Sequence, residues 1–230
     1  MEDNYYNKYI TYKSKYLNLK NNLIQNGGNV NLLSPEEIDQ LFNNRDGFGI
    51  NEIDENKYKN KYAVSTYGEL TGEGLIKIIE MCKKLGMNDL QERNFVDLGS
   101  GTGRVVFNAS IYFNQVHGVE LSTKRHNIGS KILKENKNRL RNNIHLVNGD
   151  MYEFNCSEMD VVYISSLCFT DGMMERLKEK LGRELKTGSL IFTSKEMDIE
   201  DNDNFVKLEN ELNVKMTWND NSQLYIYKKV

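Results

Sequence analysis

The spacing of apolar positions changes repeatedly along the chain from about residue 75 onward. Short apolar runs alternate with longer segments in which apolar residues recur every three or four positions. These two spacings are typical of buried strands and of amphipathic helices, respectively. The predicted strands cover residues 94–98, 115–120, 144–147, 160–164, 189–194, 205–217 and 223–229. The predicted helices cover residues 75–85, a segment from about 104, 123–139 and 172–185.

This order of elements predicts the fold. Alternating strands and helices build a parallel sheet with helices on both faces, and the last two strands read as an antiparallel hairpin joined at residues 218–222. We therefore predict a doubly wound, Rossmann-like α/β fold, with a seven-stranded sheet that ends in the hairpin. Ligands of such folds bind at the carboxyl ends of the strands.

The N-terminal part of the chain follows a different pattern. One stripe of a predicted helix over residues 5–24 carries Tyr5, Tyr9, Tyr12, Tyr16, Leu19 and Leu23. Residues 34–37 read as a capping box with a proline in the first turn, which predicts a second helix up to about residue 42. We divide the chain into an N-terminal helical extension, 1–61, and an α/β domain, 62–230. We expect the striped helix to dock on its own domain or on a partner.

Composition and charge narrow the class of protein. The 230 residues carry a formal net charge of −3, which argues against strong, general nucleic-acid binding. Cys82, Cys156 and Cys168 are far apart in the sequence, so neither a disulfide pattern nor a metal-ligand spacing results. We expect buried, reduced thiols, no signal peptide and no membrane-spanning segment. These features predict a soluble intracellular protein of the nucleus or cytoplasm.

The candidate binding residues surround a glycine-rich turn after the first predicted strand. Gly99, Gly101 and Gly103 give the spacing G-x-G-x-G. Asp97 stands just before this turn, and Glu120 ends the next predicted strand, where a carboxylate can bind ribose hydroxyls. Dinucleotide enzymes favour G-x-G-x-x-G, and Asp97 would repel a pyrophosphate but could accept hydrogen bonds from an ammonium group. The pattern favours S-adenosylmethionine, and the alternative is a turn with only a structural role.

A further carboxylate follows the predicted strand at 144–147. Asp150 is placed to accept a hydrogen bond from an adenine amino group, while Met151 covers the ring. A single acid at a strand end is often a helix cap or a loop residue. Acids at the ends of the first three strands of one domain favour a nucleoside site instead.

The segments around the turn resemble the class I S-adenosylmethionine-dependent methyltransferases, and among them the Dot-one (disruptor of telomeric silencing) family of non-SET histone-lysine methyltransferases. Residues 95–106 are similar to that family's glycine-loop signature, and residues 191–195 are similar to its fifth strand. Tyr67 and Glu69 match a family segment that closes over the methionine end of the cofactor. The resemblance covers residues 62–230. It implies S-adenosylmethionine as cofactor and a protein substrate such as a histone or nucleosome.

The resemblance also implies an acceptor site. Trp218 and Tyr225 have the separation of a family Trp and Tyr that line a lysine channel, and Phe169 would add to its apolar wall. Ser165 stands where the family has an Asn beside the transferred methyl group, so this contact is lost or water-mediated. An apolar channel lowers the pKa of a lysine ammonium, and no general base is then required. The alternative is that Phe169 and Trp218 serve only in packing.

Several functions stay open at this point. The first is a protein-lysine methyltransferase, the second a methyltransferase for a small molecule or RNA, and the third a non-catalytic cofactor-binding module whose N-terminal helix recruits partners. A dehydrogenase is the fourth, because the glycine spacing is unfavourable for a dinucleotide. The negative net charge and the lack of the family's basic extension leave the histone substrate open. The Tyr- and Lys-rich first 24 residues also resemble leader segments of some large-DNA-virus proteins.

Overall fold

The computed structural model describes residues 32–43, 45, 47, 68–200 and 204–230. Residues Leu33–Val230 form one compact unit. The predicted helix over residues 5–24, the boundary between 61 and 62, and the candidate residue Tyr67 lie outside the described residues. Among the helices that are described, none is long and apolar enough to cross a membrane.

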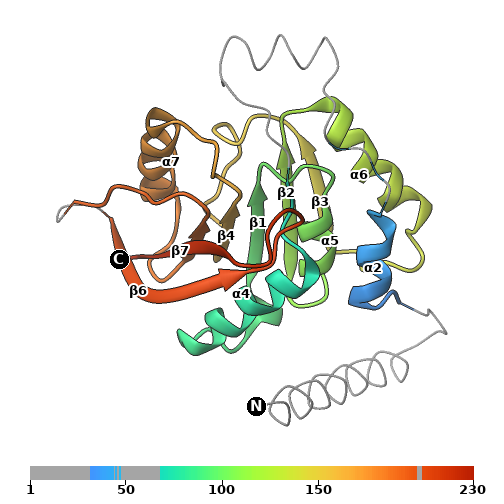
Figure 1. Ribbon diagram of the computed structural model, residues 1–230, viewed down its shortest axis with the longest axis horizontal. Helices are drawn as coiled ribbons and strands as arrows, with labels where there is room; N and C mark the ends of the chain where they lie inside the picture. Colours follow the sequence, from blue (N-terminus) through green and yellow to red (C-terminus); the bar gives the residue numbers. More distant parts are fainter. Residues whose placement is uncertain (1–31, 44, 46, 48–67, 201–203) are drawn as a thin grey trace. The chain divides into compact units, whose positions relative to one another are not determined.

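A seven-stranded sheet organises this unit, in the order β3-β2-β1-β4-β5-β7-β6 (Figure 1). Its strands are β1 (Asn94–Leu98), β2 (Gln115–Glu120), β3 (Ile144–Asn148), β4 (Val161–Ile164), β5 (Leu190–Thr193), β6 (Phe205–Val214) and β7 (Ser222–Lys229). Strands β1 to β5 run parallel to one another, whereas β7 runs antiparallel to both β5 and β6. From β1 the chain first adds β2 and β3 on one side of the sheet and then crosses to add β4 and β5 on the other side, so the strand order reverses at β1. This confirms the predicted Rossmann-like sheet and its terminal hairpin.

Most of the described helices begin directly after a side chain that caps them. The described helices are α2 (Pro35–Leu41), α4 (Gly72–Lys84), α5 (Arg104–Ala109), α6 (Thr123–Glu135) and α7 (Asp171–Glu184), with a short 3-10 helix η1 (Leu90–Glu92). Four helices have a hydroxyl cap that accepts a hydrogen bond from the amide three residues later, at Ser34, Thr71, Ser122 and Thr170. The predicted capping box of α2 is confirmed. Helix α6 ends earlier than predicted, because the Asn136 amide group donates to the Ile132 carbonyl oxygen at 2.9 Å and the chain turns there.

Alternating side chains of the sheet supply two apolar layers. Phe95, Val161 and Phe192 face the layer that includes α4 and α5, and Val96, Val162 and Ile191 face the layer that includes α7. Alternate residues of a strand point to opposite faces of the sheet. A strand covered on both faces therefore needs apolar residues at every position, which explains the continuous apolar runs.

Two of the three cysteines lie in these layers and one does not. Cys82 and Cys156 are buried, and burial raises the pKa of each thiol to about 12. The expectation that Cys168 is buried is wrong. It lies in the turn between β4 and α7, where its side chain is exposed.

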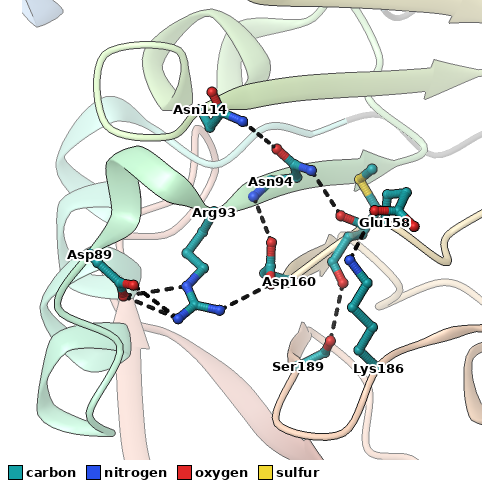
Figure 2. Close-up of polar contacts among 9 residues, drawn as sticks. Asp89, Arg93, Asn94, Asn114, Glu158, Asp160, Lys186 and Ser189 are labelled. Carbon is teal, nitrogen blue, oxygen red and sulfur yellow. Dashed lines mark hydrogen bonds and ion pairs between the residues drawn. The ribbon is translucent and has the colours of Figure 1, made fainter.

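Hydrogen-bonded polar side chains close the amino end of the sheet (Figure 2). Asp160, directly before β4, accepts hydrogen bonds from the Asn94 backbone amide at 2.8 Å and from an Arg93 guanidinium nitrogen at 3.4 Å. Arg93 also pairs with Asp89 at 3.0 Å. The start of β1 is thereby fixed to the start of β4, and the opposite end of the sheet is left for the candidate site.

Candidate cofactor cleft

A cleft opens at the carboxyl ends of β1, β2 and β4, beside the point where the strand order reverses. This is the place where open α/β sheets bind ligands. The predicted site residues that line it are Glu69, Asp97, Gly99, Gly101, Glu120, Asp150, Met151, Ser165 and Phe169. Gly103, Trp218 and Tyr225 are not among the lining residues.

The glycine-rich turn forms the floor of the cleft. Gly99, Gly101 and Gly103 have φ angles of 92°, 57° and 97°, a region that residues with a Cβ rarely adopt. The backbone amides of Gly99 and Ser100 both donate to the Val119 carbonyl oxygen, at 2.8 and 3.0 Å. Gly103 serves the turn differently from the other two. It caps α5, and a Cβ there would lie 3.1 Å from the Phe107 ring.

Asp97 is the most unusual side chain of the cleft. It is 2% exposed, and its Oδ1 has no hydrogen-bond partner among the described residues. Burial raises the pKa of the Asp97 carboxyl well above its ordinary value, and the charges of Glu120 and Glu69 act in the same direction. A buried oxygen without a partner is costly unless a ligand supplies a donor. Asp97 therefore fits the ammonium group of an amino-acid ligand.

Glu120 joins the glycine turn to the next helix. One of its carboxylate oxygens accepts from the Gly101 backbone amide and the other from the Ser122 backbone amide, both at 2.8 Å. The side chain is 4% exposed and lines the cleft. Glu120 thus ties the glycine turn to the start of α6 and brings its carboxylate to the cleft.

Asp150 and Met151 form a third part of the wall. The Gly149 backbone amide donates to the Glu120 carbonyl oxygen at 3.0 Å, which holds the turn after β3 against β2. Asp150 Oδ1 accepts from the Tyr152 backbone amide at 2.9 Å. Met151 is half-buried beside it. The end of β3 thus contributes an acceptor and an apolar side chain to one side of the cleft.

The turn after β4 forms the opposite wall, where Ser165 and Phe169 line the cleft. Lys195, after β5, fixes this turn in two ways. Its ammonium group donates to the Phe169 carbonyl oxygen at 2.7 Å and pairs with Asp171 at 2.8 Å. Its backbone amide donates to Ser166 Oγ at 3.0 Å. Two of the predicted acceptor residues, Ser165 and Phe169, therefore lie on a turn that Lys195 holds in place.

The two aromatic residues of the predicted channel lie at different places. The ring of Trp218 packs directly over Gly68, which lines the cleft, because a Cβ on Gly68 would lie 2.0 Å from that ring. Trp218 is 47% exposed. Tyr225 lies on β7, opposite Thr193 of β5, and the Lys207 ammonium lies 5.4 Å from its ring centroid. Trp218 is thus at the rim of the cleft, and Tyr225 is part of the sheet.

The segment that carries Glu69 is held by the hairpin turn. The Glu69 backbone amide donates to Thr217 Oγ1 at 3.1 Å, and the Thr217 amide donates back to the Glu69 carbonyl oxygen at 2.8 Å. Leu70 forms an isolated antiparallel bridge with Met216. The amino side and the carboxyl side of the domain meet at this edge of the cleft.

Sequence reasoning missed three lining or adjoining residues. Tyr163 of β4 lines the cleft as a fully buried side chain, and burial raises the pKa of its hydroxyl. Arg125 of α6 also lines the cleft, and its Nε donates to the Gly47 carbonyl oxygen at 2.8 Å. Arg104, the first residue of α5, pairs with Glu69 at 2.9 Å. Its position directly after the glycine turn was the available signal.

Comparisons with known proteins agree with this geometry. A family model described as the ANTKMT methyltransferase domain matches residues 97–200. A histone-lysine N-methyltransferase of Caenorhabditis elegans, H3 lysine-79 specific, is 29% identical over 157 residues, which are 63% of this chain and 16% of that protein. A protein-lysine N-methyltransferase of Saccharolobus islandicus (strain REY15A) is 29% identical over 123 residues, 53% of this chain and 71% of that protein. The chain thus spans about one sixth of the length of the first relative.

A solved structure shares the fold over most of its length. It is a putative RNA methyltransferase from Pyrococcus horikoshii, superposed with a TM-score of 0.53 at 16% identity, covering 85% of this chain and 98% of that one. Likeness at this identity concerns the fold alone. The chain therefore has the Rossmann-like fold of S-adenosylmethionine-dependent methyltransferases, and the matched family model and the cleft together indicate S-adenosylmethionine as its cofactor.

Proposed function

We propose that this protein is an S-adenosylmethionine-dependent methyltransferase that methylates lysine side chains of proteins. The observation that carries the cofactor half of the proposal is the buried, unpartnered carboxyl oxygen of Asp97 beside a glycine turn. The acceptor half is supported by the two relatives at 29% identity, which are both named as lysine methyltransferases. A histone is the narrower candidate within this class of substrate.

Different residues of the cleft would bind different parts of the cofactor. Asp97 would hold the ammonium group, Glu120 the ribose hydroxyls, and Asp150 with Met151 the adenine ring. When bound, S-adenosylmethionine supplies an electrophilic methyl group on a sulfonium centre. The protein's own task is to orient the acceptor and exclude water.

The residues around the acceptor would favour the neutral form of the lysine side chain. A free lysine has a pKa near 10.4 and must lose a proton before its nitrogen is a nucleophile. Phe169 on the turn after β4 and Trp218 at the rim would surround the side chain with apolar surface, which disfavours its ammonium form. Ser165 lies on the same turn as Phe169 and offers one hydroxyl toward the cleft.

A labelling experiment tests the proposed function. The protein is incubated with radiolabelled S-adenosylmethionine and, separately, with nucleosomes, free histones, RNA and cell extract. Label on lysine residues of a protein fraction, identified by mass spectrometry, is the expected result. Label on RNA, or on small molecules alone, would overturn the lysine assignment and leave the cofactor assignment intact.

A single substitution tests the acceptor wall. Trp218→Ala removes apolar surface at the rim without touching Asp97, Glu120 or Asp150. We expect turnover to fall at least tenfold while the affinity for S-adenosylmethionine, measured by calorimetry, changes less than threefold. Equal losses of turnover and affinity would assign Trp218 to the packing of Gly68 instead.

A further inference from the structure

We propose that Asp39 of α2 is a positioning residue for the cofactor cleft, and that it acts through Arg104 on Glu69. The proposal rests on the proposed function, since it concerns the same cleft. Asp39 itself does not line the cleft, whereas Glu69 does. The connection runs through one guanidinium group with a carboxylate on either side.

Arg104 bridges the two carboxylates. Its Nε donates to Glu69 Oε2 at 2.9 Å, and one terminal nitrogen lies 3.3 Å from Asp39 Oδ1 and 3.4 Å from the Asp39 carbonyl oxygen. The Arg104 side chain is only 11% exposed and that of Glu69 8%. Hydrogen bonds to charged groups in such shielded places are stronger than those on the surface. Arg104 is therefore held from both sides.

The carboxylate of Asp39 is surrounded by donors. Its Oδ1 accepts from Arg104 and also from the Asn108 side-chain amide at 3.0 Å, while its Oδ2 accepts from the Gly72 backbone amide at 3.2 Å. Every partner donates, so both oxygens must be acceptors. An amide in this place would turn an NH₂ group toward a donor. The site thus requires a carboxylate and not merely a polar side chain.

Apolar packing fixes α2 against α5, beside which it lies in Figure 1. Ile38 and Phe42 are 2% and 3% exposed. The Phe42 ring meets the Phe107 ring edge-on at a centroid distance of 5.2 Å, and the Arg104 guanidinium lies 5.4 Å from the centroid of Phe42. Asp39 is therefore presented to Arg104 by a well-anchored helix.

The position of Glu69 matters because its carboxylate lines the same cleft as the carboxyl groups of Asp97 and Glu120. Glu69 and Glu120 both raise the pKa of Asp97 by their charge. Arg104 balances one of these charges, and Thr102 Oγ1 donates to the remaining Glu69 oxygen at 2.6 Å. If Arg104 loses Asp39, it loses one of its two anionic partners. Glu69 is then held less firmly, and both the shape and the charge of the cleft change.

Calorimetric titration of the 230-residue chain with S-adenosylmethionine tests this connection. We expect Asp39→Asn to weaken binding about tenfold, and Glu69→Gln to weaken it by at least as much. In the double variant, Asp39→Asn should add less than a threefold loss, because its effect passes through Glu69. Fully additive losses, or less than a twofold change in Asp39→Asn, would overturn the proposal.

The matched control is Glu37→Gln on the same helix. Glu37 pairs with Arg139 at 2.9 Å on the surface, and its side chain is 45% exposed. This variant perturbs α2 without touching Arg104, so binding should stay within twofold of the wild type. A similar loss in Glu37→Gln and Asp39→Asn would mean that α2 matters only through its general stability, which would also overturn the proposal.

Two further measurements guard against misfolding and separate the two proposals. Arg104→Lys keeps the charge but cannot hold two carboxylates in the same fork geometry, so it should reproduce the tenfold loss of affinity. Adding Asp39→Asn to this variant should then change the affinity very little.

Bound cofactor should also slow hydrogen exchange of the α2 amides, because linkage is reciprocal. Unchanged α2 exchange at saturation would count against the connection. A wild-type protein that does not bind S-adenosylmethionine would overturn both proposals, whereas normal binding by Asp39→Asn would overturn only this one.

Discussion

Asp97 lies on β1 and Asp160 lies directly before the neighbouring strand β4, so the two carboxyl groups stand at opposite ends of the sheet. Their surroundings also differ. Asp160, at the amino end, accepts hydrogen bonds from the Asn94 amide and from Arg93 (Figure 2). Asp97, near the carboxyl end of β1, is buried with one oxygen that none of the described residues hydrogen-bonds. The amino end of the sheet is therefore built for stability. The carboxyl end holds a buried oxygen that has no hydrogen-bond partner among the described residues and that a donor group of a ligand can satisfy.

This contrast explains why one kind of side chain has two functions in one fold. A buried carboxylate with donors contributes to stability, and its removal leaves those donors unpaired. A buried carboxyl without a donor costs stability and is retained where binding requires it. Substitutions at the two positions should consequently move stability and binding in different proportions.

The largest expected effect is the loss of cofactor affinity in Asp97→Asn. The variant keeps the volume of the side chain but removes its negative charge. A charge-assisted hydrogen bond contributes about 1.5–3 kcal/mol, so the affinity for S-adenosylmethionine should fall by roughly 10- to 100-fold. The melting temperature without ligand should be unchanged or higher. Unaltered affinity by calorimetry would remove Asp97 from the site.

Asp160→Asn should show the opposite pattern. An amide nitrogen would face either the Asn94 amide or Arg93, both of which are donors. We expect the free energy of unfolding to fall by about 1–3 kcal/mol in denaturant titrations. Affinity for S-adenosylmethionine should stay within twofold of the wild type. A large loss of affinity here would show that the two ends of the sheet are coupled.

The pH dependence should distinguish stability from binding at Asp97. Its pKa is raised in the folded state, so between pH 3.8 and that raised value the folded carboxyl keeps a proton that the unfolded chain has released. The contribution of Asp97 to the free energy of unfolding therefore falls as pH rises through this window. Binding of an ammonium group favours the ionised form, so cofactor affinity should rise with pH in the same window, by up to about tenfold per pH unit.

Asp97→Asn is also the control for this titration. Both slopes should be lost in that variant, because the amide does not titrate. Calorimetry between pH 5 and 7 measures the binding slope, and thermal unfolding measures the stability slope. Slopes that persist in Asp97→Asn would have to be assigned to another group of the cleft.

The smallest expected effect concerns a partly buried histidine. His117 of β2 stacks on His145 with a centroid distance of 4.7 Å, and burial lowers its pKa to about 4. The unfolded chain takes up a proton below pH 6.5, whereas the folded chain does not, so stability should be lost as pH falls from 6.5 toward 4. At pH 5 the loss should be about 1–2 kcal/mol relative to His117→Phe, by denaturant titration. The pH dependence of cofactor affinity should reflect the titration of Asp97, and His117→Phe should leave it unchanged.

The sheet was largely predictable because its signals are local. The strands at 94–98 and 115–120 were predicted at their observed bounds, and the capping box at 34–37 fixed the start of α2. Asp97 and Glu120 follow from their positions relative to the glycines. Each of these predictions depends on residues within about twenty positions of one another.

The remaining features depend on tertiary contacts that spacing does not encode. Asp39 and Arg104 are 65 positions apart, and α2 was assigned to an extension, although it belongs to the same compact unit as the sheet. Trp218 and Tyr225 were paired through a family resemblance, yet one lies at the rim on Gly68 and the other within the sheet. Their shared role in a lysine channel stays a prediction. Cys168 was misplaced because a turn at a strand end exposes side chains that an apolar core would bury.

The position of β7 has a consequence for the order in which the cleft forms during synthesis. The strand enters the sheet between β5 and β6, and the turn before it holds the backbone of Glu69 and Leu70 through Thr217 and Met216. The glycine turn and Asp97 are translated more than a hundred residues before β7. The wall formed by Glu69 and Leu70, however, can be held in place only after β7 has left the ribosome and paired with β5 and β6. A nascent chain stalled before Ser222 should accordingly possess the parallel strands and still fail to retain the cofactor.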